Sequence, residues 1–147
     1  MCKSYFLDKK KTFPKNLKVL VRVDFNVPIK NNFVVDDSRI LLCIPTIKLL
    51  LENNNAIILI SHLGRPKKNE KNLSMEIVIN HMKKMSFFQK KTIQFCDSFE
   101  EKKLDKAKKK INLGEILVLE NLRFDIGEQS SNALFAKKIA KNIDFFI

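Results

Sequence analysis

The chain has 147 residues, of which 45% are hydrophobic, and it carries a formal net charge of +12 at pH 7. This length suffices for one domain with an ordinary core. The longest apolar runs, such as Ala56–Ile60, are far shorter than the ~20 residues of a transmembrane helix. The first ten residues lack the apolar segment of a secretory signal. We therefore expect a cytoplasmic protein with no membrane partner.

The basic charge raises the question of a nucleic-acid partner. The lysines occur in short scattered runs, and the chain is also rich in Asn, Ile and Phe. These four residue types share A/T-rich codons, so codon bias accounts for the charge without a polyanion. The sequence has no RNP1, zinc-finger or helix-turn-helix pattern. We expect solvated lysine faces and no nucleic-acid partner.

Three cysteines, Cys2, Cys43 and Cys96, show no C-x-x-C spacing and no histidine close in sequence. An odd number of scattered cysteines is typical of free thiols in a reducing compartment. We therefore expect no disulfide and no metal site in this chain.

Apolar runs and helical periodicity alternate along the sequence. The predicted strands are residues 18–24, 56–61, 92–96, 116–120 and 144–147. Four helices are predicted between them: one capped by Asp37 or Ser38, one from Ser74 to about Met85, one from Ser98 through Lys108, and one from Asn132 through Lys141. This alternation predicts an α/β fold, with a parallel Rossmann-like sheet flanked by helices.

The arginines are the most informative charged residues. Only four of the 28 basic residues are arginine: Arg22, Arg39, Arg65 and Arg123. Three follow or end predicted strands, and Arg39 lies near the start of the first helix, where the helix dipole favours anions. Ligands of parallel sheets bind beyond the carboxyl ends of the strands. Because a guanidinium binds phosphate or carboxylate in a bidentate manner, we expect the four arginines to converge on one anion site.

Glycine is rare, with only Gly64, Gly114 and Gly127 in the chain. Gly64 and Gly127 flank arginine loops, where a positive φ or a close backbone approach is expected. Gly114 is expected in a turn. The sequence has no GxxxxGK[ST], GxGxxG or G-x-S-x-G motif. The residues alone thus indicate an α/β domain that binds a small phosphorylated or carboxylated metabolite, without indicating a reaction.

Five blocks of sequence, in order and in register from about Lys18 to the end, resemble the phosphoglycerate kinase family. They are residues 22–28 (RVDFNVP), 37–40 (DSRI), 45–47 (PTI), 61–66 (SHLGRP) and 119–124 (LENLRF) followed by 127–128 (GE). Lys68, Ile77 and the pair Asp125 and Ile126 depart from the family pattern, but none replaces a substrate ligand.

The resemblance implies a glycolytic kinase that transfers a phosphoryl group between 1,3-bisphosphoglycerate and ADP, with Mg²⁺. It implies that Asp24 and Asn26 bind the glycerate oxygens, and that His62, Arg65 and Arg123 bind its phosphate. Arg39 is the implied catalytic residue, stabilising charge at the reacting end. The implied substrate-binding residues are Asp24, Phe25, Asn26, Arg39, His62, Leu63, Gly64, Arg65 and Arg123. Two roles stay open for Arg22. It could form a structural ion pair, with Asp24 or with a helix, or it could belong to the anion site.

The resemblance covers about the first third of such an enzyme. We expect residues 1–147 to form an incomplete N-terminal substrate-binding domain, with the C-terminal domain that binds ADP or ATP absent. We expect no nucleotide or metal ligand in this chain, no kinase activity from it alone, and a monomeric full enzyme. The alternative is a truncated, noncatalytic anion-binding protein. His81 lies outside every motif and is expected to be a surface or packing histidine.

Overall fold

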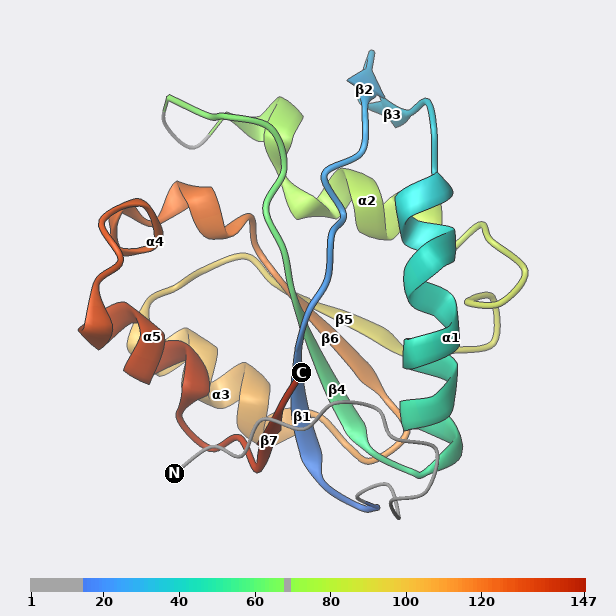
Figure 1. Ribbon diagram of the computed structural model, residues 1–147, viewed down its shortest axis with the longest axis vertical. Helices are drawn as coiled ribbons and strands as arrows, with labels where there is room; N and C mark the ends of the chain where they lie inside the picture. Colours follow the sequence, from blue (N-terminus) through green and yellow to red (C-terminus); the bar gives the residue numbers. More distant parts are fainter. Residues whose placement is uncertain (1–14, 68–69) are drawn as a thin grey trace.

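The computed structural model describes residues 15–67 and 70–147, and it contains a five-stranded parallel sheet at its centre (Figure 1). The strands are β1 (Lys18–Arg22), β4 (Ala56–Ile60), β5 (Ile93–Cys96), β6 (Ile116–Leu119) and β7 (Phe145–Phe146). Their order across the sheet is β5-β6-β4-β1-β7. The predicted α/β class and the five predicted strands are therefore confirmed. Cys2, Lys68 and the lysines of residues 9–11 lie outside the described residues.

Helices cover both faces of the sheet. On one face lie α1 (Ser38–Glu52) and α2 (Met75–Met82), and on the other lie α3 (Glu101–Lys110) and α5 (Ala133–Ala140) (Figure 1). Successive side chains of a strand point to opposite faces, so β1 contributes Val19 to the first core and Leu20 to the second. Because both faces are buried, the central strands are continuous apolar runs with no alternation.

Short elements that the sequence analysis did not predict lie in the connections. They are β2 (Ile29–Lys30), β3 (Phe33–Val34), the 3₁₀ turns η1 (Lys71–Leu73) and η2 (Leu122–Phe124), and α4 (Ile126–Gln129). The β2–β3 hairpin turns at Asn31 and Asn32, whose φ angles are 51° and 62°. Asparagine tolerates this left-handed conformation, which a two-residue hairpin turn requires.

Two of the four predicted helix caps differ from the structure. Ser74 and Asn132 do cap α2 and α5, since their side chains accept hydrogen bonds from backbone N–H groups of the first turn. Asp37 occupies the N-cap position of α1 but its carboxylate bonds no amide there. Ser98 does not begin α3: the helix starts at Glu101, and the Ser98 hydroxyl instead accepts a bond from the N–H of Glu100. The second helix also ends earlier than predicted, at Met82.

Lys108 is an exception to the expected solvated lysine faces, because its side chain is fully buried. Its ammonium donates to the carbonyls of Lys138, Ile139 and Lys141 at 2.9, 3.2 and 2.8 Å. Those carbonyls lie at the C-terminal end of α5, where the helix dipole favours a cation. Lys108 therefore joins α3 to α5, and burial lowers the pKa of its ammonium.

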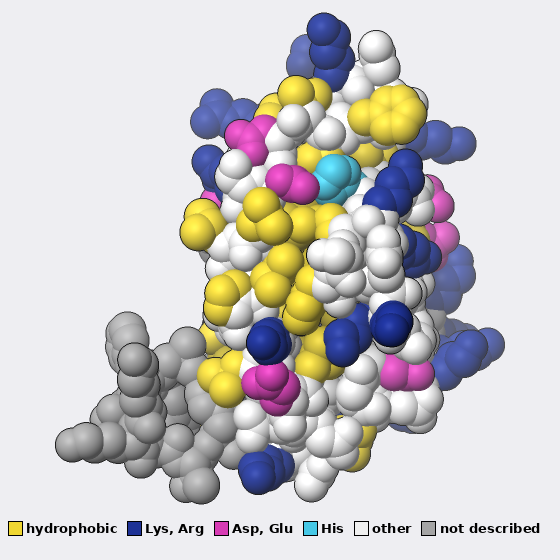
Figure 2. Space-filling model, turned by 90° about the vertical axis from the view of Figure 1, so that its right-hand side faces the viewer, with side chains coloured by type: hydrophobic (Ala, Val, Ile, Leu, Met, Phe, Trp, Pro, Cys, Tyr) yellow, Lys and Arg dark blue, Asp and Glu magenta, His cyan; other side chains and the backbone are white. Residues whose placement is uncertain are grey.

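Cys43 and Cys96 are free thiols, as predicted, and burial raises the pKa of both. Figure 2 shows hydrophobic side chains gathered on the face that α1 presents to solvent. Leu41 and Leu42 of α1 are exposed, as are Phe33 and Val35 at the hairpin. In the described ranges, no helix combines the length and the apolar character needed to cross a membrane.

Candidate anion-binding site

The site predicted from the arginines lies at one edge of the sheet, where three loops leave adjacent strands. Strands β1, β4 and β6 are neighbours in the sheet and parallel. Their carboxyl ends lead into residues 23–28, 61–66 and 120–124, which hold most of the predicted site residues. The parallel register therefore brings together residues that lie 38 and 59 positions apart in the sequence, as in the bonds of Gly64 with Asn26 and with Arg123.

Side chains of one loop bond the backbone of the next. The Oδ1 atom of Asn26 accepts a hydrogen bond from the N–H of Gly64 at 2.8 Å. The Ser61 hydroxyl oxygen accepts one from the N–H of Phe25 at 2.9 Å. These two bonds fix the loop after β1 against the loop after β4.

Glu120 and Asn121 are buried polar residues that the sequence analysis quoted within a motif but assigned no role. Asn121 Oδ1 accepts from the N–H groups of Leu63 and Arg123, both at 3.1 Å, and its Nδ2 donates to the Leu63 carbonyl at 2.7 Å. Asn121 thus joins the loops after β4 and β6. The signal that could have found both residues is a pair of polar side chains directly after a fully apolar strand.

The four arginines have different partners. Arg123 donates to the carbonyl of Gly64, and Arg39 forms an ion pair with Asp24. Arg65 is exposed and makes no hydrogen bond or ion pair with the residues that the structure describes. The side chains of Arg39, Arg65 and Arg123 therefore come from three elements that meet at the same edge of the sheet.

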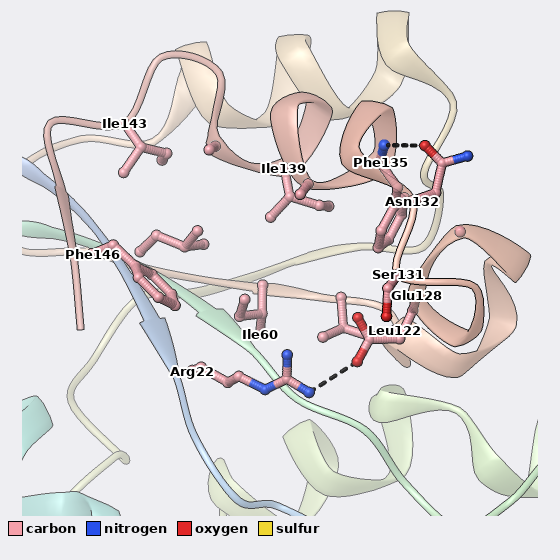
Figure 3. Close-up of a pocket in the computed structure, with 14 residues that line it drawn as sticks. Arg22, Ile60, Leu122, Glu128, Ser131, Asn132, Phe135, Ile139, Ile143 and Phe146 are labelled. Carbon is pink, nitrogen blue, oxygen red and sulfur yellow. Dashed lines mark hydrogen bonds and ion pairs between the residues drawn. The ribbon is translucent and has the colours of Figure 1, made fainter. Parts of the chain in front are cut away.

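Arg22 has the helical partner that the sequence analysis left open. Its guanidinium bonds the Glu128 carboxylate of α4 at 2.8 Å (Figure 3). This ion pair lines a largely apolar groove of about 610 Å³ between the sheet and α5, to which Ile139 and Phe146 also contribute. In this structure Arg22 is therefore engaged in a structural ion pair.

His62 lies in the field of both positive and negative groups. Burial lowers the pKa of its imidazole, and the charge of Arg123 lowers it further. Asp24 and Glu128 act in the opposite direction. The neutral imidazole is thus favoured in the ligand-free protein, whereas an anion bound beside His62 would favour the protonated form.

Phe25 and Leu63 are buried, so their side chains belong to the core. Any contact that they make with a ligand uses the backbone. Gly64 has a φ of +59°, and a Cβ atom there would lie 2.8 Å from a methyl group of Leu73. Both observations confirm the expectation of a special backbone at Gly64.

His81, the histidine outside every motif, lies in α2 and is partly buried. Its Nε2 atom lies 2.9 Å from Oδ2 of Asp37. This agrees with the expected surface or packing histidine, and its partner lies two residues before Arg39.

Over residues 15–67 and 70–147, no group of three or more His, Cys, Asp or Glu side chains is arranged to hold a metal ion. Asp24 and Glu128 are each paired with an arginine, and the Glu120 carboxylate accepts hydrogen bonds from Ser74 and Met75. The geometry here suits an anionic ligand.

Comparison with known proteins decides the family. The sequence model of phosphoglycerate kinase matches residues 10–147. The chain belongs to the phosphoglycerate kinase family. The phosphoglycerate kinase of Wolbachia sp. subsp. Drosophila simulans is 42% identical over 132 residues, which are 90% of this chain and 32% of that protein. The enzyme of Dictyoglomus turgidum is 37% identical over 148 residues, covering 100% of this chain and 36% of its own length.

Solved phosphoglycerate kinases share the fold. The structure from Coxiella burnetii superposes with a TM-score of 0.73 at 31% identity, covering 90% of this chain and 32% of that chain. The structure from Pyrococcus horikoshii gives a TM-score of 0.73 at 27% identity, with 33% of that chain covered. The chain therefore spans about a third of the length of the phosphoglycerate kinases that it matches.

Proposed function

We propose that this chain supplies the glycerate-phosphate site of a phosphoglycerate kinase. The enzyme would move a phosphoryl group reversibly between 1,3-bisphosphoglycerate and ADP, giving 3-phosphoglycerate and ATP. The observation that carries the proposal is that three loops are bonded to one another at one edge of the sheet, through Asn26 with Gly64 and Gly64 with Arg123. Family membership supplies the substrate class.

In this proposal, Arg123, Arg65 and His62 bind the phosphate of the substrate. Arg123 is already oriented by the Gly64 carbonyl, and Arg65 is free to contact an anion. His62 would become protonated beside the phosphate. Asp24 and Asn26 would bind the glycerate hydroxyl and neighbouring oxygens, and the backbone of Phe25, Leu63 and Gly64 would complete the site. Each charge-assisted hydrogen bond contributes about 1.5–3 kcal/mol.

Arg39 is proposed as the catalytic residue. Phosphoryl transfer requires little covalent help from the protein, so catalysis depends on positioning and on positive charge placed where negative charge develops. In the ligand-free protein the guanidinium of Arg39 is held by Asp24, and both side chains are exposed. Arg39 would exchange this partner for the reacting end of the substrate.

We expect no nucleotide or Mg²⁺ ligand in this chain, an expectation supported by the lack of a phosphate-binding glycine loop in its sequence. We propose that parts of the family sequence beyond this match bind ADP or ATP with Mg²⁺, in a cytoplasmic enzyme that acts as a monomer. The 147 residues alone would then bind substrate without transferring the phosphoryl group.

Calorimetric titration of the chain with 3-phosphoglycerate tests the binding proposal. Arg65→Gln should weaken binding about tenfold or more, since it removes a charge-assisted contact. Lys67→Gln is the matched control, because Lys67 is exposed and carries the same charge two residues away. Equal affinities for the two variants, or no binding by the unmodified chain, would contradict the proposed site.

A coupled assay for ATP formation tests the second part of the proposal. Purified chain, free of host kinase, should give no turnover. Turnover that follows the chain through purification and disappears in Arg39→Ala would show that the 147 residues are catalytically sufficient.

A further inference from the structure

The contact between His81 and Asp37 joins α2 to α1, and Asp37 is the N-cap residue of α1. The backbone carbonyl of Asp37 accepts from the N–H of Leu41 at 3.0 Å and so begins α1. Its carboxylate bonds no amide of α1 and instead lies 2.9 Å from His81 Nε2. The side chains of His81 and Asp37 are 29% and 35% exposed, so water competes with this bond only in part.

The first turn of α1 is also held by Ile40, which is buried in the core, and by two polar contacts. The Asp36 carboxylate accepts from the N–H and the hydroxyl of Ser38, which orders the turn locally. Arg39 follows directly, and it pairs with Asp24 in the loop after β1. His81 thus bonds this turn to α2 through Asp37, which lies two positions before Arg39.

The opposite end of α2 is fixed to the loop that carries Arg123. The Ser74 hydroxyl and the Met75 N–H both donate to the Glu120 carboxylate at 2.8 Å. Glu120 is buried and precedes Asn121, whose side chain accepts from the Arg123 N–H. Helix α2 therefore connects the Arg123 loop at its N-terminal end with the turn before Arg39 at its C-terminal end.

We propose that His81 is a positioning residue of the anion site: through Asp37 it fixes the first turn of α1 and thereby places Arg39. This inference rests on the proposed function, in which Arg39 contacts the substrate. The required property of His81 is a hydrogen-bond donor at the position of Nε2. A glutamine at this position offers an amide donor, whereas a phenylalanine keeps the ring and loses the donor.

Two variants and a matched control test the proposal in the full 147-residue chain. His81→Phe should move the backbone amide chemical shifts of Ser38 and Arg39 without ligand, and should weaken 3-phosphoglycerate binding about threefold to tenfold. His81→Gln should restore both readouts. Asn80→Ala, an exposed change on the same helix, should alter neither.

Asp37→Ala removes the other partner and keeps the test decisive if His81→Phe does not fold. It should give the same amide changes, and the double variant should add little to either single change. Unmoved Ser38 and Arg39 amides, or a His81→Gln variant as impaired as His81→Phe, would overturn the inference. Absence of binding by the unmodified chain would instead overturn the proposed function, while the ligand-free amide shifts would still decide the role of His81.

Discussion

Asn26 and Gly64 lie 38 residues apart in the sequence, yet the Asn26 side-chain oxygen accepts a hydrogen bond from the Gly64 N–H at 2.8 Å. Gly64 also accepts a bond from the guanidinium of Arg123, so one glycine connects three loops. Its φ of +59° presents the N–H and the carbonyl to different neighbours, in a conformation that few other residues adopt. The proposed anion site is therefore ordered before any ligand binds.

Two substitutions of Asn26 separate its hydrogen bond to Gly64 from the effect of charge on ligand binding. Asn26→Ala leaves the Gly64 N–H without its acceptor and should lower the free energy of unfolding by about 1 kcal/mol. Asn26→Asp keeps an acceptor oxygen, so its stability should stay near that of the unmodified chain, while its added negative charge should weaken 3-phosphoglycerate binding. Urea denaturation and calorimetric titration measure the two effects. Equal loss of stability in both variants would contradict this role for Asn26.

The close packing of α4 against α5 depends on Gly127. A Cβ atom at this position would lie 2.6 Å from Cβ of Phe135. Gly127→Ala should therefore destabilise the chain by about 1–3 kcal/mol, because the two helices must move apart. Thermal unfolding of Gly127→Ala beside Ile126→Ala, a change at an exposed side chain of the same helix, checks this expectation. A Gly127→Ala variant as stable as the unmodified chain would show that α4 is free to shift.

Removal of the buried ammonium of Lys108 should lower the stability of the folded chain. Lys108→Met leaves three carbonyls at the end of α5 without their donor, and we expect a loss of about 2 kcal/mol or more in the free energy of unfolding. Lys109→Met is the matched control, because Lys109 is exposed on the same helix. Similar stabilities for the two variants would contradict the structural role of Lys108.

His62 should make stability depend on pH. Burial and the charge of Arg123 lower the pKa of folded His62 below its usual value of 6.5. The unfolded chain then binds more protons than the folded chain as pH falls through 6.5, so the unfolding free energy should fall there and level off below the folded pKa.

The comparison of unmodified chain with His62→Gln, denatured by urea from about pH 7.5 to about pH 5, tests this expectation. The variant should lose part of the decline in stability with falling pH. An identical pH dependence in both proteins would show that His62 binds protons equally in the folded and unfolded states.

The sequence predicted what depends on local patterns. Ala56–Ile60 is a continuous apolar run, and Ser74 and Asn132 are caps followed by periodic helices, so these elements were assigned correctly. Parallel strand order places Arg65 and Arg123 at this edge, and the start of α1 places Arg39 there, whereas Arg22, the fourth arginine expected in the anion site, pairs with Glu128. The sequence motifs identified the loops after β1, β4 and β6, and the strand order of the sheet shows that these loops are neighbours.

What could not be predicted depends on contacts through space. Asp37 occupies the predicted N-cap position of α1, but its carboxylate bonds His81 of another helix rather than the amides of α1, a contact that residue type could not indicate. Lys108 is chemically like its neighbours in a lysine run, and only the position of α5 makes it a buried donor. The partner of Arg22 stayed open for the same reason, since Glu128 lies 106 residues away.

A map of backbone amide chemical shifts during titration with 3-phosphoglycerate tests the central claim most directly. The account predicts that the perturbed amides cluster at residues 24–26, 62–65, 121–123 and the first turn of α1, and that Arg65→Gln suppresses the response. No response, or changes confined to the groove beside Arg22 and Phe146, would contradict a glycerate-phosphate site at this edge of the sheet.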